Sequence, residues 1–221
     1  MNLFNRLKAD CSADWNAYTH HAFVEGMGDG TLPEKSFQHY LVQDYLFLIQ
    51  FARAHALAVY KARNLAEMRG ALEGLKAILD TEMNLHLKLC AEWGLNAEEV
   101  ENTPEAKPTI AYTRYVLEAG QAGDLLDLFV ALSPCMIGYA EIGKRLIALP
   151  DGNSDDNPYA VWIREYASDG YQDLATDTGA LLDRLAERSL TEARYPQLLE
   201  LFRQATRLEA DFWEMGMTLA D

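Results

Sequence analysis

The chain has 221 residues, 49% of them hydrophobic and 24% charged, a composition typical of a globular protein with one sizeable core. Its 34 acidic side chains outnumber its 19 basic ones, and the net charge is −15. This charge argues against a nucleic-acid or anionic-membrane partner, because such partners are bound by clustered Lys and Arg. The three cysteines form no CxxC pair, so neither a disulfide framework nor a zinc site is expected.

The first residues, "MNLFNRLKADCSADW", carry charges every few positions, unlike a signal peptide. Uncharged runs elsewhere are shorter than the roughly 20 residues that a membrane helix needs. We therefore expect a cytoplasmic protein without a membrane or nucleic-acid partner.

Apolar residues recur at helical spacing along nearly the whole chain, and no segment shows the sustained alternation of a strand. Three loop-like segments, "EGMGDGTLP", "ENTPEAKP" and "LPDGNSDDNP", interrupt the pattern without forming an interdomain linker. The sequence predicts one all-α domain over residues 1–221, a helical bundle. The expected helices span residues 2–19, 33–62, 64–94, 107–121, 124–149, 157–187 and 193–218.

The helix expected over 33–62 carries Asp44, whose helical neighbours include Phe37, Phe47 and Phe51. A carboxylate on such a face points toward the core, where an unpaired charge is costly. Two interpretations stay open. Asp44 is either a buried acid satisfied by a tyrosine hydroxyl or a backbone amide, or an acceptor for a ligand NH group in an aromatic pocket.

The helix expected over 64–94 carries Glu82 among apolar neighbours, with His86 one turn later. The pair can be structural, with the two side chains bonded to each other or to the backbone. Metal ligation is the alternative, but di-iron bundles use Glu-x-x-His, and none of the five histidines follows a glutamate by three residues. We expect no metal here, and a structural or supporting role for the pair.

The helix expected over 124–149 contains "LSPCMIGYAEIG", in which Cys135 follows Pro134 on an apolar face. A continuous helix would be kinked by the proline, at a cost of roughly 3 kcal/mol. If Ser133 instead caps a new helix, Cys135 lies in its first turn, where free N–H groups favour a thiolate. Gly138 is expected to leave room for a ligand. The residues alone do not decide between a nucleophile and a small core side chain.

The last expected helix, over 193–218, carries Glu209 with Phe202, Phe212 and Trp213 on the same face. A desolvated glutamate has a raised pKa, which suits proton transfer near neutral pH. The alternative is a buried acid paired with an Arg or Tyr of another helix.

Four aromatic residues, Phe47, Tyr112, Tyr139 and Tyr166, lie in apolar stretches of four different expected helices. Each is an ordinary core residue by itself. A flat heteroaromatic ligand would need such stacking surfaces, but the sequence does not show that they converge.

Four segments together, "HAFVEGMGDGTLPEKSFQHYLVQDYLFL", "LSPCMIGYAEIG", "PYAVWIREYAS" and "EADFWEMG", resemble the TenA family of thiaminase II and aminopyrimidine aminohydrolase proteins. The similarity runs from about Trp15 to about Met217, with the motifs in matching order. The resemblance implies a haem-oxygenase-like all-α fold and a homotetramer.

The resemblance also implies roles for particular residues. Cys135 matches the catalytic cysteine of the cysteine-containing branch, Glu209 the catalytic glutamate, and Asp44 the aspartate that holds the aminopyrimidine. Pocket tyrosines are matched by Tyr112, Tyr139 and Tyr166.

Phe47 stands where many members of the family have tyrosine, so stacking is retained there and a hydroxyl is not. The pair of Glu82 and His86 recurs in the family and is expected to support the site rather than to perform chemistry.

The implied reaction converts 4-amino-5-aminomethyl-2-methylpyrimidine to the 5-hydroxymethyl pyrimidine and ammonia in thiamin salvage. Thiamin itself is an expected slower substrate, and no metal or organic cofactor is needed. Two other functions stay open. One is a haem- or metal-binding oxidase on the same fold, with His20 or His21 as axial ligand, and the other is a non-catalytic pyrimidine-binding or regulatory protein.

Overall fold

The computed structural model describes residues 2–221, except for the side chains of Thr81 and Leu85. Every regular element within the described range is helical, which confirms the expected all-α class. The helices in chain order are α1 (Leu3–Asp10), α2 (Ser12–Thr19), α3 (Ala22–Gly28), α4 (Glu34–Lys61), α5 (Leu65–Ala77), the π-helical turn η1 (Ile78–Glu82), α6 (Met83–Glu92), α7 (Ala97–Asn102), α8 (Lys107–Ala122), α9 (Leu125–Leu146), α10 (Ala160–Ala167), α11 (Asp169–Ser189) and α12 (Tyr195–Thr218).

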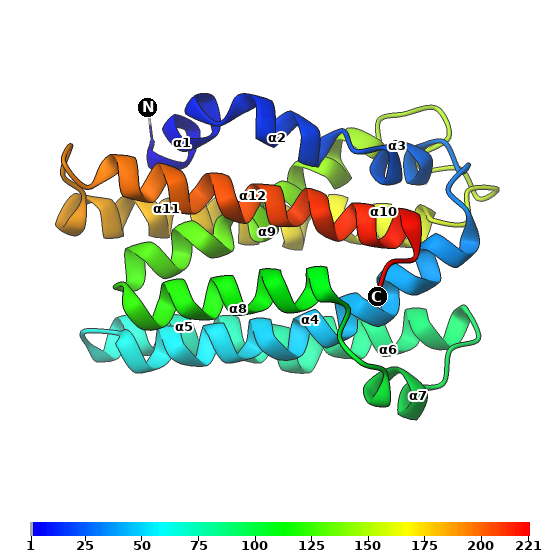
Figure 1. Ribbon diagram of the computed structural model, residues 1–221, viewed down its shortest axis with the longest axis horizontal. Helices are drawn as coiled ribbons and strands as arrows, with labels where there is room; N and C mark the ends of the chain where they lie inside the picture. Colours follow the sequence, from blue (N-terminus) through cyan, green and yellow to red (C-terminus); the bar gives the residue numbers. More distant parts are fainter. Residues whose placement is uncertain (1) are drawn as a thin grey trace.

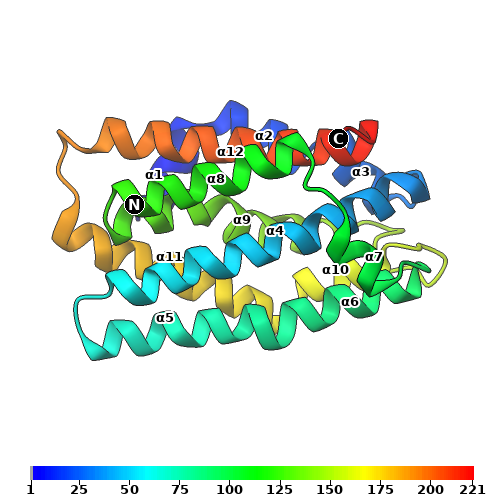
Figure 2. The same cartoon turned by 60° about the horizontal axis from the view of Figure 1, so that its bottom comes forward.

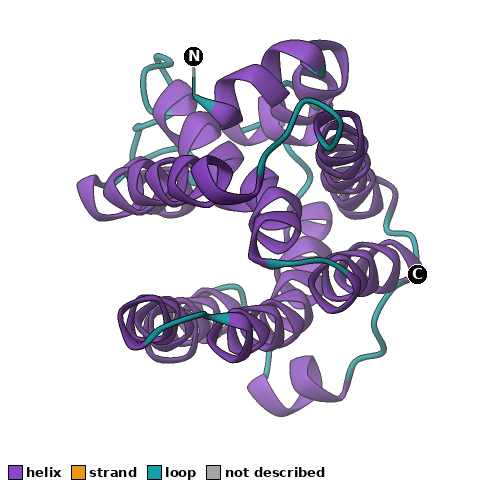
Figure 3. Ribbon diagram, turned by 90° about the vertical axis from the view of Figure 1, so that its left-hand side faces the viewer, coloured by secondary structure: helices purple, strands orange, loops and turns teal. Residues whose placement is uncertain are grey.

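The long helices run roughly along one axis of the molecule, as Figure 1 shows from the side and Figure 3 nearly end-on. Helix α9 lies inside the bundle and packs against α8, α10, α11 and α12. Helix α4 packs against α5, α8 and α12, and α5, η1 and α6 continue one another along the outer edge (Figure 2). The core therefore sits around α4, α9 and α12.

The predicted helices differ from the observed ones mainly where a polar side chain caps an extra end. The segment expected as one helix over 157–187 is divided at Ser168, whose hydroxyl accepts from the N–H of Tyr171. Helices α3 and α7 were not expected, and their first turns are capped by the side chains of His21 and Asn96. The segment expected over 2–19 is divided at Cys11.

Pro134 lies inside an unbroken α9, so of the two alternatives the continuous helix is the one observed, and no new helix begins at Ser133. A proline has no N–H for the carbonyl four residues earlier, which here belongs to Val130. The hydroxyl of Ser133 donates to that carbonyl at 2.9 Å and replaces the missing partner. Ser133 thus acts within the helix rather than as its cap.

Two glycines of α9 allow close packing rather than ligand entry. A Cβ on Gly138 would lie 2.5 Å from the ring of Tyr18, so the space expected for a ligand there is filled by a side chain of α2. A Cβ on Gly143 would lie 2.6 Å from the backbone of Tyr166. The absence of this Cβ lets α10 approach α9 and brings Tyr166 to the site.

The start of α9 is fixed by charge as well as by packing. Asp124 and Asp127 form a capping box, in which each side chain accepts from the other residue's backbone N–H. Arg194, just before α12, donates to both carboxylates at 2.7 Å. The helix that carries Cys135 is therefore joined to the helix that carries Glu209.

By length and composition α9 could cross a membrane, but 78% of its most apolar window is buried inside the bundle. Its apolar character is accounted for by its place in the core, since such a helix is apolar on nearly all sides.

Candidate active site

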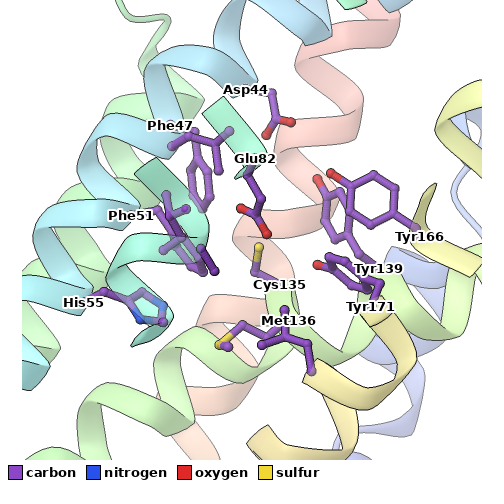
Figure 4. A pocket seen from close by; sticks show the side chains of 15 residues that line it. Asp44, Phe47, Phe51, His55, Glu82, Cys135, Met136, Tyr139, Tyr166 and Tyr171 are labelled. Atoms are coloured by element: carbon purple, nitrogen blue, oxygen red, sulfur yellow. The ribbon is translucent and has the colours of Figure 1, made fainter. Parts of the chain in front are cut away.

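A small pocket opens between α4, the η1 turn, α9, α10 and the start of α11 (Figure 4). Its walls are mostly aromatic or apolar, with two carboxylates and one thiol facing inward. The side chains labelled in Figure 4 are Asp44, Phe47, Phe51, His55, Glu82, Cys135, Met136, Tyr139, Tyr166 and Tyr171.

Asp44 is buried on α4 and held by two partners. The hydroxyl of Tyr40, one turn earlier, donates to its Oδ2 at 2.9 Å, and Nε2 of His86 lies 2.5 Å from the same oxygen. Both contacts fall on Oδ2, so Oδ1 can accept from a ligand. The two interpretations of Asp44 are therefore compatible, because a structural network aims one of its oxygens at the pocket.

His86 serves as the support of Asp44. Burial acts to lower the pKa of its imidazole, but the charge and hydrogen bond of Asp44 outweigh burial, and the net pKa is raised. The other ring nitrogen lies 3.2 Å from the backbone carbonyl of Glu82. His86 thus bonds to the Glu82 backbone and to Asp44, and the Glu82 carboxylate lines the pocket separately.

Cys135 lies in the middle of α9 with its thiol half-buried in the pocket wall. Burial, followed by the negative charge of Glu209, raises the pKa of the thiol well above its usual range. No helix N-terminus offsets this effect, so a thiolate stabilised by a first turn is not formed here. The thiol is protonated at rest and needs a base before it can attack.

Glu209 lies close enough to the Cys135 thiol to exchange a proton with it. It is 1% exposed on α12, its Oε1 accepts from the hydroxyl of Tyr112 at 2.8 Å, and its carboxyl lies near the Cys135 thiol. Burial first, and then the charge of Asp44, raise its pKa to about 8, against the opposing effect of the Tyr112 hydrogen bond. A carboxyl with this pKa gives or takes a proton readily near neutral pH.

Three of the four expected aromatic residues line the pocket, and the fourth lies behind it. The rings of Tyr139 and Tyr166 lie 5.0 Å apart on one wall, and Phe47 forms the opposite wall. Tyr112 packs behind Phe47 at 5.1 Å and reaches the site through Glu209.

Tyr171 is a pocket residue that the sequence did not reveal. Its ring packs on Tyr166 at 4.7 Å, and burial raises the pKa of its hydroxyl well above the usual range, so the hydroxyl stays neutral. Its position depends on the break at Ser168, which changes the face that α11 presents. The tyrosine hydroxyl considered as a partner of Asp44 is that of Tyr40, which stands four residues earlier on the same face.

The histidines considered for haem lie elsewhere. His20 is exposed and pairs with Glu25, while His21 caps α3 and lies 3.3 Å from Glu214. Neither lines the pocket, and no group of three or more His, Cys, Asp or Glu side chains gathers in metal-binding geometry among the described residues.

The chain is similar to known proteins over nearly its whole length. The TENA/THI-4/PQQC family profile matches residues 9–219. An uncharacterized protein of Haemophilus influenzae is 43% identical over 206 residues, which cover 93% of this chain and 94% of that protein. A protein named aminopyrimidine aminohydrolase from Halalkalibacterium halodurans is 41% identical over 202 residues, with coverage of 91% and 89%.

Solved structures agree on the fold. The crystal structure of a TenA family transcription regulator from a Silicibacter species matches with a TM-score of 0.92 and 46% identity, over 97% of this chain and 96% of that one. A domain of unknown function with a heme oxygenase-like fold from Shewanella denitrificans has a TM-score of 0.77 at 13% identity, over 98% and 92%. The second match concerns the fold alone and confirms the expected haem-oxygenase-like architecture.

Proposed function

Because the chain belongs to the TENA/THI-4/PQQC family, we propose that it is an aminopyrimidine aminohydrolase of thiamin salvage. The substrate is 4-amino-5-aminomethyl-2-methylpyrimidine, which water converts to the 5-hydroxymethyl pyrimidine and ammonia. One observation carries the proposal: Cys135 and Asp44 line one aromatic pocket, and Glu209 lies buried behind it next to the Cys135 thiol, in a chain whose relatives bear that enzyme name.

In the proposed mechanism the thiol of Cys135 adds to ring carbon 6, next to the carbon that bears the aminomethyl group. The S–C6 bond forms, and the thiol proton passes by way of Glu209 to ring nitrogen N1. This relay suits a thiol and a carboxyl that lie near each other and are both protonated at rest. Addition removes the aromaticity of the ring.

Asp44 then has more than an anchoring role. With the ring no longer aromatic, the 4-amino group donates electrons through the C4–C5 double bond and expels the amine from the methylene carbon. Positive charge develops on the 4-amino nitrogen as it does so. A carboxylate that accepts from that nitrogen stabilises this charge, and Asp44 has Oδ1 available while Tyr40 and His86 hold Oδ2.

Water adds to the exocyclic methylene carbon, and departure of the Cys135 sulfur restores the ring. Tyr139, Tyr166 and Phe47 provide the flat walls on which the pyrimidine stacks. In this mechanism the reaction steps use only nucleophilic and acid–base chemistry of these side chains, without a cofactor.

Parallel incubation with the aminomethyl pyrimidine and with thiamin tests the proposal, with ammonia and the pyrimidine products followed by chromatography. We expect ammonia release from the first substrate and slower cleavage of thiamin. Tight pyrimidine binding without product would instead favour a regulatory binding protein, a function that the name of the Silicibacter relative also suggests.

We further propose that residues 1–221 act as a single cytoplasmic domain that assembles into a homotetramer. The family match over residues 9–219 supports one domain. The assembly is supported by exposed apolar side chains of α5, among them Leu65 and Leu72. Sedimentation of the purified protein tests the oligomeric state, and a monomer at micromolar concentration would contradict it.

A further inference from the structure

Glu82 occupies an unusual backbone position beside the site. It is the last residue of η1, a π-helical turn between α5 and α6. Such turns are rare, occur mostly as single-turn insertions in α-helices, and are frequent at functional sites. Figure 4 shows the Glu82 carboxylate pointing into the pocket, between Asp44 and the sulfur of Cys135.

The surroundings of Glu82 leave its carboxyl available for chemistry. Burial, then the charges of Asp44 and Glu165, raise its pKa to about 7, although His86 acts in the opposite direction. The ring of His86 bonds to Asp44 and to the Glu82 backbone rather than to the Glu82 carboxylate. Among the described side chains none donates a hydrogen bond to this carboxylate.

The pyrimidine itself indicates what lies next to Glu82. Its reacting substituent is on ring carbon 5, flanked by carbon 4 with the amino group and by carbon 6. In the proposed binding mode Asp44 accepts from the 4-amino group and Cys135 attacks carbon 6. The substituent on carbon 5 must then lie between Asp44 and Cys135, which is where Figure 4 places the Glu82 carboxylate.

We propose that Glu82 is a catalytic residue that protonates the departing amine and then takes a proton from the water that replaces it. This inference rests on the proposed function and goes beyond the supporting role expected from the sequence. Glu209 does not serve the leaving amine as well, because it is held by Tyr112 and in the proposed mechanism already moves the proton between the thiol and the ring nitrogen.

The proposed step balances. The carboxyl of Glu82 gives its proton to the amine nitrogen as the C–N bond breaks, and ammonia leaves with the bonding electron pair. The resulting carboxylate then removes a proton from water as the oxygen bonds to the methylene carbon. Glu82 ends protonated, as it began, and is ready for the next turnover.

Leaving groups that cannot accept a proton provide the test. Glu82→Gln and the wild-type enzyme are compared in single turnovers of the 5-aminomethyl substrate and of its 5-trimethylammoniomethyl analogue, which releases trimethylamine without a proton. We expect the variant to lose about 100-fold in ammonia release, within the usual range for general acid catalysis, and less than about fivefold in trimethylamine release. Glu92→Gln, an exposed exchange on α6, is the matched control and should change neither rate.

Chemical rescue is an independent second measurement. In Glu82→Ala, formate added to the buffer should restore at least about a tenth of the lost ammonia-release rate, because a small acid can enter the space left by the side chain. A residue that only positions its neighbours would not be rescued in this way.

Equal losses for both leaving groups, or no rescue by formate, would overturn the role of Glu82. An inactive wild-type enzyme would instead count against the proposed function. The two failures are therefore distinguishable.

Discussion

Helices α9 and α5 differ sharply in how the fold holds them. Most of the 22 residues of α9 are buried, whereas none of the 13 residues of α5 is. Yet both lead to the pocket, since α9 carries Cys135 and α5 runs into the turn that carries Glu82. The proposed nucleophile thus lies on a helix of the closely packed core, whereas the proposed proton donor lies on a turn that follows a helix without a fully buried side chain.

This difference has a chemical reason. A thiol that must meet one ring carbon benefits from a rigid support, because misplacement of a reacting group by 1 Å costs much of the rate. A proton donor serves first the leaving amine and then the incoming water. Elements whose side chains are less buried open locally at lower free energy, and no side chain of α5 is fully buried.

Removal of the α9 thiol should have the largest effect. We expect Cys135→Ala to lower the single-turnover rate of ammonia release at least about 10⁴-fold, or about 5.5 kcal/mol of transition-state stabilisation. The unfolding midpoint should change little, because the side chain is small and only half-buried. Retained activity would remove Cys135 as the nucleophile, and denaturant titration of the variant checks the fold.

Glu209, which lies near that thiol, should make the unfolding free energy decrease as the pH rises. Its pKa is raised from 4.5 to about 8, so the folded chain keeps a proton that the unfolded chain loses as pH rises. Unfolding free energy should therefore decrease between pH 4.5 and pH 8, by at most about 5 kcal/mol.

Urea unfolding at pH 5 and at pH 8.5 measures this decrease. In Glu209→Gln the side chain stays neutral, so most of the decrease should disappear, while catalysis is lost with the proton relay. Parallel pH curves for the variant and the wild type would contradict the assignment.

His55, at the contact between α4 and α5, should make the unfolding free energy decrease as the pH falls. Its ring lies against Gly74 of α5, where an added Cβ would be 3.1 Å from Nδ1, and its Nε2 is buried without a partner in the described part of the chain. Burial lowers its pKa from 6.5 to about 4. As pH falls through this interval the unfolded chain gains a proton that the folded chain excludes, so stability decreases by about 3 kcal/mol.

His55→Phe should abolish that decrease, because phenylalanine does not titrate and is similar in size. Unfolding at pH 7 and at pH 4 provides the measurement, with His20→Phe, at an exposed histidine, as the control that should behave like the wild type. If the variant lost as much unfolding free energy between pH 7 and pH 4 as the wild type, His55 would have to be protonated in the folded chain.

More of the site residues on α9, α4 and α12 could be predicted from the sequence than of those on the α5 side. Asp44, Glu209 and Cys135 were found because a regular helix fixes which neighbours share a face. Glu82 was also singled out by its apolar neighbours, but the separation of its carboxylate from His86 was not predictable, since a π-helical turn leaves no mark in the spacing of apolar residues. For the same reason the pairing of His86 with Asp44, 42 residues away, required the structure.

The smallest effect is expected at the outer face of α5. Leu72 is 38% exposed there, and Leu and Ala are both good helix formers, so Leu72→Ala isolates the packing of this side chain. Its cost in unfolding free energy should be below about 0.5 kcal/mol. Leu132→Ala is the matched exchange in α9, where the side chain is fully buried, and should cost about 2–5 kcal/mol.

Protein concentration sharpens this last comparison. If the exposed face of α5 is covered in the proposed homotetramer, the cost of Leu72→Ala should rise with protein concentration, because assembly adds stability by mass action. The cost of Leu132→Ala in the core should stay constant. A large and concentration-independent cost at Leu72 would mean that α5 is held by its own chain more firmly than its exposure indicates, and the contrast between the two helices would fail.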